Sequence, residues 1–121
     1  MHSDPSHLEK GRYGEQLAAE YLQNAGLHIL ERNWRHSKCE IDLIAREGEA
    51  LVFIEVKTRS SDYFGPPEAF VSEKKERMMQ EAASVYMEAI GHDWEVRFDI
   101  VSVLLHADGG HQLEHFRDAF F

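Results

Sequence analysis

Two carboxylates and a lysine interrupt apolar segments near the middle of the sequence. Asp42 lies within "EIDLIA", and Glu55 and Lys57 follow the apolar run "ALVFI". Burying such charges costs several kcal/mol unless they are paired or bound to a metal ion. Two neighbouring carboxylates repel each other unless a positive charge lies between them, and a hard divalent cation with oxygen ligands supplies that charge. Asp42, Glu55 and Lys57 are therefore the first candidates for a metal-assisted reaction.

The segments around these residues predict a β-hairpin that turns at Glu47-Gly48. Side chains alternate between the two faces along a strand, so Glu55 and Lys57 share one face. The other face of that strand is wholly apolar and consists of Val52, Ile54 and Val56. In the preceding strand the apolar face consists of Ile41, Leu43 and Ala45. The two apolar faces should pack into the same core.

The register of the hairpin decides whether the charged side chains meet. A two-residue turn at Glu47-Gly48 pairs Arg46 with Glu49, and Asp42 with Phe53. Asp42 and Glu55 then become diagonal neighbours, about 7 Å apart at Cα. Charged residues are also common on the solvent-exposed face of an antiparallel hairpin, so a purely structural role is the alternative.

The elements that must position the hairpin are a helix before it and a helix after it. Leu8 to Ala25 has apolar residues at helical spacing and ends at Gly26, while Gly14 inside it predicts close approach to another backbone. A strand is expected at 27–34, a loop at 60–70, a second helix capped by Ser72 and Gly91, a strand at 96–105, and a weaker strand or tail at 112–120. The order α-β-β-β-α-β-β predicts an α/β fold with a mixed sheet of four to five strands.

Length and composition limit the classes of protein to consider. A chain of 121 residues fits one domain, expected at residues 9–121, with residues 1–8 disordered. The longest apolar run, five residues, is too short to span a membrane, and the first residues lack the apolar region of a secretory signal, so a cytoplasmic location is expected. One cysteine excludes an internal disulfide. The net charge of −9 argues against a broad nucleic-acid-binding surface.

Six ordered blocks of the sequence resemble the YraN-like family of bacterial proteins, which is related to archaeal Holliday junction resolvases and to the PD-(D/E)xK nucleases. The blocks are "GRYGEQLAAEYL", "RNWR", "EIDLIA", "FIEVKTR", "VSEKK" and "RFDIVSV". The resemblance extends over Gly11–Leu104 and implies a restriction-endonuclease-like fold. By position in the motif, Asp42 is the motif aspartate, Glu55 and Lys57 are the Glu-x-Lys pair, and Glu15 is the carboxylate of the first helix. Cys39 stands where relatives usually have glycine.

The resemblance implies hydrolysis of phosphodiester bonds in structured or branched DNA with the help of Mg²⁺ or Mn²⁺. Asp42, Glu55, the backbone carbonyl of Val56 and Glu15 would hold the metal ion, which would lower the pKa of a bound water. Lys57 would orient that water or stabilise the developing charge. A non-catalytic nucleic-acid-binding or protein-interaction module that kept the fold is the alternative function.

Basic residues near these motifs are candidates for contacts with DNA. They are Arg12, Arg32, Arg35, Arg59 and Lys75. For the arginines a solvated surface position is an equal alternative. Lys75 is expected in the first turn of the second helix, where free N–H groups favour an anion, but a solvated surface position is the favoured interpretation for it. Asp99 interrupts an apolar strand and is expected to be a hydrogen-bonded structural carboxylate. Because a four-way junction requires two symmetric cuts, the resemblance also suggests a homodimer.

Overall fold

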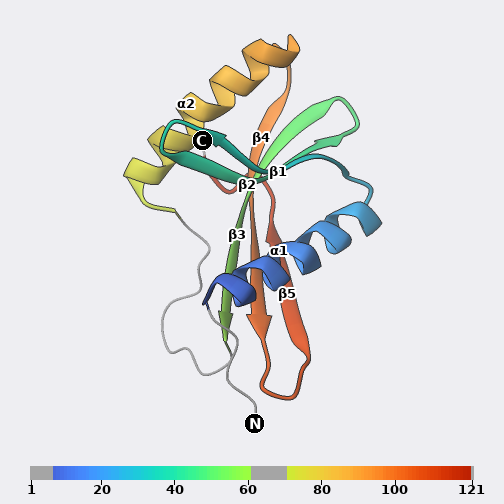
Figure 1. The fold of residues 1–121 in the computed structure, drawn as a ribbon. Helices are drawn as coiled ribbons and strands as arrows, with labels where there is room; N and C mark the ends of the chain where they lie inside the picture. Colours follow the sequence, from blue (N-terminus) through green and yellow to red (C-terminus); the bar gives the residue numbers. More distant parts are fainter. Residues whose placement is uncertain (1–6, 61–70, 121) are drawn as a thin grey trace.

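The computed structural model describes residues 7–60 and 71–120 (Figure 1). The elements in chain order are α1 (His7–Asn24), β1 (His28–His36), β2 (Cys39–Glu47), β3 (Ala50–Ser60), α2 (Glu73–Ile90), β4 (Val96–Leu105) and β5 (His111–Phe116). This order and the α/β class confirm the prediction from the sequence. The expected disorder of residues 1–8 and the expected loop at 60–70 fall mostly outside the described residues, although His7 and Leu8 belong to α1 and Ser60 to β3.

The five strands form one mixed sheet in the order β1-β2-β3-β4-β5. Only β3 and β4 run parallel, because α2 connects them as a crossover, and the other neighbours are antiparallel. β3 is therefore the central strand, and its side chains supply two cores. Val52 and Ile54 pack on α1, whereas Leu51 and Phe53 pack on α2. No helix among residues 7–60 and 71–120 is long and apolar enough to cross a membrane.

The register of the β2–β3 hairpin differs from the predicted one. The structure pairs Leu43 with Ile54 and Glu47 with Ala50, so the prediction that Asp42 pairs with Phe53 is wrong by two residues. The turn consists of Gly48 and Glu49, because a two-residue hairpin turn needs positive φ at its first central position, and Gly48 adopts φ 59°. A shift of two residues leaves each side chain of β3 on its predicted face.

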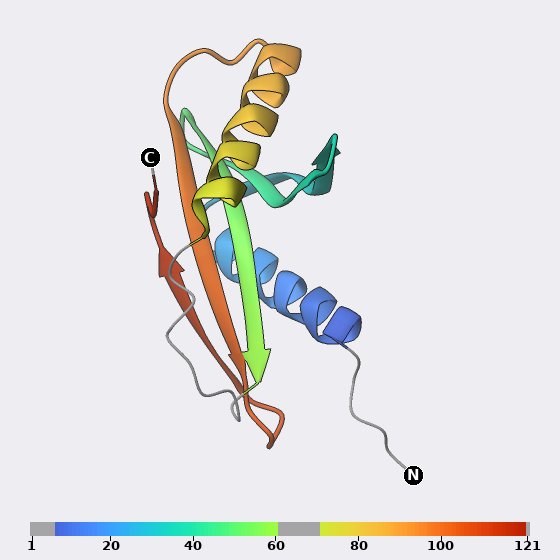
Figure 2. The ribbon, with the colours of Figure 1, turned by 90° about the vertical axis from the view of Figure 1, so that its left-hand side faces the viewer.

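The predicted apolar face of β2 is also interrupted. Leu43 and Ala45 pack on the α1 side as expected, but Ile41 packs with Ile44 on the α2 side. The strict alternation expected for a flat strand is thus broken between Ile41 and Leu43. Figure 2 shows the reason: the far part of the β1–β2 hairpin projects away from β3, β4 and β5.

Local signals in the sequence place the two helices as expected. A Cβ atom at Gly14 would overlap the side chain of Thr58, so α1 does approach β3 closely there. Ser72 caps α2 by accepting a hydrogen bond from the backbone of Lys75, and Gly91 ends the helix at φ 71°. These contacts fix α1 against one side of β3 and start α2 beside β2.

Candidate active site

Asp42 lies where β2 separates from β3. The pairing of the two strands ends at Leu43 and Ile54. Beyond that pair the backbone N–H of Val56 donates a hydrogen bond to Asp42 Oδ2 (2.7 Å). In a continued antiparallel ladder this N–H would meet a backbone carbonyl of β2, so the carboxylate of Asp42 takes the place of that carbonyl. The separation of the strands thereby fixes one oxygen of Asp42 against β3.

Glu55 is the second carboxylate at this point, and its side chain is almost completely buried, with 6% of the residue exposed. Burial, together with a hydrogen bond to Glu55 and repulsion by its charge, raises the pKa of Asp42 to about 8. The Val56 N–H and the ammonium of Lys75 favour the ionised form of Asp42 but do not outweigh these effects. The two carboxylates that the sequence placed near each other therefore do meet, and their charges are strongly unfavourable together.

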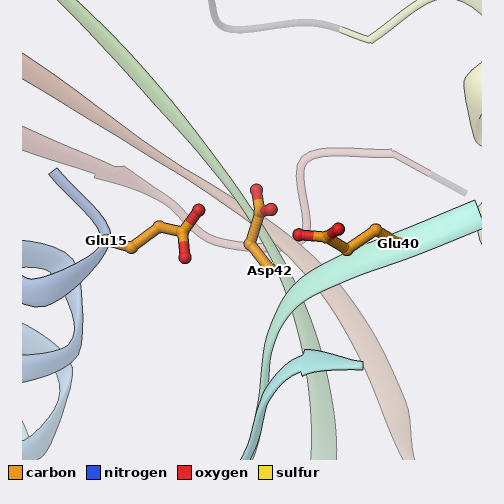
Figure 3. A group of neighbouring side chains, drawn as sticks. All are labelled: Glu15, Glu40 and Asp42. Carbon is orange, nitrogen blue, oxygen red and sulfur yellow. The ribbon is translucent and has the colours of Figure 1, made fainter. Parts of the chain in front are cut away.

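Three carboxylates from two elements come close enough to share a metal ion. Glu15 of α1 and Glu40 and Asp42 of β2 each offer one oxygen within 4.8 Å of the others (Figure 3). Burial and repulsion by Asp42 raise the pKa of Glu15. All donors are carboxylate oxygens, which suit a hard cation such as Mg²⁺ or Mn²⁺. Glu40 was not among the residues selected from the sequence, although its position two residues before Asp42 was the available signal.

Asn33 supports Glu15 from the edge strand. It adopts a left-handed conformation (φ 53°) between the pairs Arg32–Leu43 and Trp34–Ile41, which places it opposite Asp42. Its side-chain amide is hydrogen-bonded to the carboxylate of Glu15 and lowers the pKa that burial raises. Asparagine tolerates this conformation better than most residues. An asparagine within the strand segment "RNWR" was therefore the available sign of an irregular backbone at this position. Sequence reasoning had not assigned Asn33 a role.

Basic side chains border the carboxylates. Arg35 forms a salt bridge with Glu40 (2.7 Å), and the charge of Arg12 acts on Glu15. Lys75 Nζ donates a hydrogen bond to the backbone carbonyl of Glu40 (3.2 Å). Three of the basic residues selected from the sequence thus lie around the acidic group.

The remaining basic candidates are Lys57, Arg59 and Arg32. Lys57 is half-buried on the face of β3 that carries Glu55, opposite Ser102 of β4. Arg59 lines a cavity of about 310 Å³ together with Ser102 and residues of β5. Arg32 donates a hydrogen bond to Gln16 of α1. The face of β3 beyond Glu55 therefore presents two cations in succession.

Asp99 belongs to a different, structural group on β4 and β5. It accepts hydrogen bonds from Arg97 (2.8 and 2.9 Å), His115 (2.7 Å) and the backbone N–H of Asp118 (2.9 Å). Burial alone would raise the pKa of Asp99, but these hydrogen bonds outweigh it and lower the pKa to about 2. Asp99 is thus a satisfied structural carboxylate, as expected from the sequence.

Cys39 is buried among the residues that pack on α2. Burial raises the pKa of its thiol, which keeps it neutral. It therefore behaves as a small apolar residue of the core.

Comparisons with known proteins agree with the resemblance noted in the sequence. The sequence model of the uncharacterised protein family UPF0102 matches residues 14–103. A UPF0102 protein of Christiangramia forsetii is 44% identical over 115 residues, covering 95% of this chain and 96% of the relative. One of Beutenbergia cavernae is 48% identical over 108 residues, covering 88% and 92%. Among solved structures, Hjc, a Holliday junction resolvase of Archaeoglobus fulgidus, is similar with a TM-score of 0.46 and 20% identity, covering 88% of this chain and 73% of that one.

Proposed function

We propose that this chain, which belongs to the uncharacterised protein family UPF0102, is a metal-dependent nuclease that hydrolyses phosphodiester bonds in structured or branched DNA. The observation that carries the proposal is the convergence of Glu15, Glu40 and Asp42 beside the buried Glu55. Four carboxylates at one place are costly for stability, and a hard cation is the partner that such a set suits best.

The residues of this chain divide into those that would hold the metal ion and those that would act on the substrate. Asp42, Glu15 and Glu40 would be metal ligands, with Glu55 and the backbone carbonyl of Val56 as the further ligands expected from the motif. A bound divalent ion supplies a Lewis acid for the phosphate and lowers the pKa of a coordinated water. The Val56 N–H keeps Asp42 oriented, because it fixes one of its oxygens.

Lys57 and the arginines would act on the substrate. Lys57, two residues beyond Glu55 on the same face of β3, would orient the attacking water or stabilise the charge that develops on the phosphate. Arg12 and Arg35 lie beside Glu15 and Glu40 and would bind flanking phosphates once the carboxylates are neutralised by the ion. On a four-way junction two symmetric cuts are needed, so a homodimer is part of the proposal.

A cleavage assay tests the proposed function directly. The parent, Asp42→Asn and the exposed control Asp93→Asn are incubated with linear, flapped and four-way DNA in Mg²⁺ or Mn²⁺. The parent and Asp93→Asn should cut at least one branched substrate, and Asp42→Asn should lose the activity by about 10³-fold or more, as expected when a group that stabilises the transition state is removed. Equal cutting by the parent and Asp42→Asn would show that the activity has another origin.

A non-catalytic module that binds nucleic acid or another protein is the second candidate. The net charge of −9 and the pairing of Arg35 with Glu40, which occupies a cation that could otherwise meet a phosphate, favour a protein as the partner of such a module. The absence of cleavage in either metal would select the non-catalytic module, and binding to four-way DNA in the same assay would identify nucleic acid as its partner.

A further inference from the structure

Lys75 connects the start of α2 to the acidic group. It is the third residue after the helix cap Ser72, whose side chain accepts a hydrogen bond from the Lys75 backbone (3.2 Å). The cap fixes the backbone of the first turn, from which the lysine side chain extends. Its Nζ then lies 3.2 Å from the backbone carbonyl of Glu40 and 3.6 Å from Glu55 Oε2. One ammonium group therefore contacts oxygens of both β2 and β3 where the two strands separate.

The burial of these groups makes the contact electrostatically important. The side chain of Glu55 is 8% exposed and that of Lys75 is 30% exposed, whereas Arg35, which pairs with Glu40, is 70% exposed. Charge interactions in a partly buried place are screened much less than those at the surface. The positive charge of Lys75 also acts on Asp42, which lies beside Glu55. Lys75 is thus a half-buried cation that acts on two carboxylates of this site, Glu55 and Asp42.

We propose that Lys75 is the internal counter-cation of the acidic group and that a divalent metal ion competes with its charge. This inference rests on the proposed metal site and assigns Lys75 a role within the protein, in place of the contact with DNA considered from the sequence. An ammonium and a divalent cation are stabilised by the same carboxylates and repel each other. Removing the charge of Lys75 should therefore lower the stability of the metal-free protein and raise its affinity for the metal ion.

Three variants separate charge, hydrogen bonding and position. Lys75→Gln keeps a donor for the Glu40 carbonyl and removes the charge, and Lys75→Arg keeps the charge. Lys74→Gln is the matched control, because it removes the same charge from the exposed neighbouring residue. Thermal unfolding in chelator and calorimetric titration with Mn²⁺ give two readouts that need no substrate.

Lys75→Gln should unfold at a lower temperature than Lys74→Gln in chelator and should bind Mn²⁺ about tenfold more tightly. Lys75→Arg should resemble the parent in both measurements. Unfolding of Lys75→Gln in chelator that is reversed by Mn²⁺ would also support the inference.

Two results would overturn the inference. Equal stability of Lys75→Gln and Lys74→Gln in chelator would show that Lys75 is not the counter-cation. Weaker Mn²⁺ binding by Lys75→Gln would show that Lys75 holds the ligands in place and does not compete with the ion. Failure of the parent to bind Mn²⁺ would instead contradict the proposed function, while the comparison in chelator would still decide the role of Lys75.

Discussion

The carboxylate of Asp42 accepts a hydrogen bond from one neighbour and is repelled by the charge of another. The Val56 N–H donates to its carboxylate, whereas burial and the neighbouring Glu55 disfavour its charge. Asparagine at this position would keep an oxygen for the Val56 N–H and would remove the repulsion. The residue should therefore be more important for binding a cation than for folding.

Asp42→Asn should leave the protein folded and raise its melting temperature in chelator. Mg²⁺ or Mn²⁺ at a hundredfold excess over the dissociation constant should stabilise the parent by about 2.7 kcal/mol by mass action, and the variant should lose most of that gain. Thermal melts with and without metal measure both effects, with Asp93→Asn as the exposed control. Equal metal-induced shifts in the parent and Asp42→Asn would place the cation elsewhere.

Asp99 has the opposite character, because its charge is stabilised by the fold. Its pKa is lowered to about 2, below the ordinary value, so its contribution to stability is complete above about pH 4 and is lost as the pH falls toward 2. Asp99→Asn leaves Arg97 and His115 without a buried anion and should cost about 3 kcal/mol at neutral pH.

Urea unfolding at several pH values tests this role of Asp99. The difference between the parent and Asp99→Asn should shrink between about pH 4 and pH 2, because the parent then loses the same charge. A difference that does not change over this range would mean that packing, and not the ionised carboxylate, is what the substitution removes.

At the scale of the elements, the position of α1 depends on a glycine. Gly14→Ala should destabilise the protein by about 2 kcal/mol although alanine favours a helix, because the added Cβ overlaps Thr58 of β3. Gly11→Ala in the same helix meets no atom within 4 Å and should stabilise the protein by up to about 1 kcal/mol. Denaturant unfolding of both variants gives the comparison. Equal changes in the free energy of unfolding for the two variants would show that helix propensity alone determines the effect of each substitution.

The elements also show what the sequence could and could not predict. Ser72, Gly91 and Gly14 are local signals, so the ends of α2 and the close approach of α1 were predictable. The predicted β2–β3 register was wrong by two residues because either Glu47 or Gly48 could be the first central residue of the turn. The positive φ of Gly48 in the structure shows that the turn begins at Gly48.

The two central carboxylates of the site could be predicted from the sequence, but the residues around them could not. Asp42 and Glu55 were found from alternation along two adjacent strands, which is a local rule. The contact between Lys75 and Glu40 joins residues 35 positions apart and depends on how α2 docks on β2. No periodicity in the sequence specifies that docking, so Lys75 could only be placed near a phosphate by its position in a first helical turn.

For the whole molecule, the net charge of −9 must be reconciled with a polyanionic substrate. In the part of the chain that the structure describes, only a few cations border the acidic group. Binding to DNA should therefore be weak without metal, should strengthen when Mg²⁺ neutralises the carboxylates, and should weaken with added salt. Lys57→Ala, which is expected to bind metal without cleaving, allows this to be measured by fluorescence anisotropy on four-way DNA. Tight binding without metal that ignores ionic strength would place the contact surface elsewhere on the molecule.

The hydrogen bond from Val56 to Asp42 joins the backbone of the central strand to the candidate metal ligand. An amide proton that donates to a carboxylate resonates at a frequency that depends on the charge and position of that carboxylate. In a nitrogen-labelled sample the Val56 amide therefore reports on Asp42 from within the sheet. The chemical shift of its cross-peak should change when Mg²⁺ is added, while the cross-peaks of the amides in the β4–β5 turn should not shift. Occupancy of the site can thus be followed by spectroscopy before any substrate has been identified.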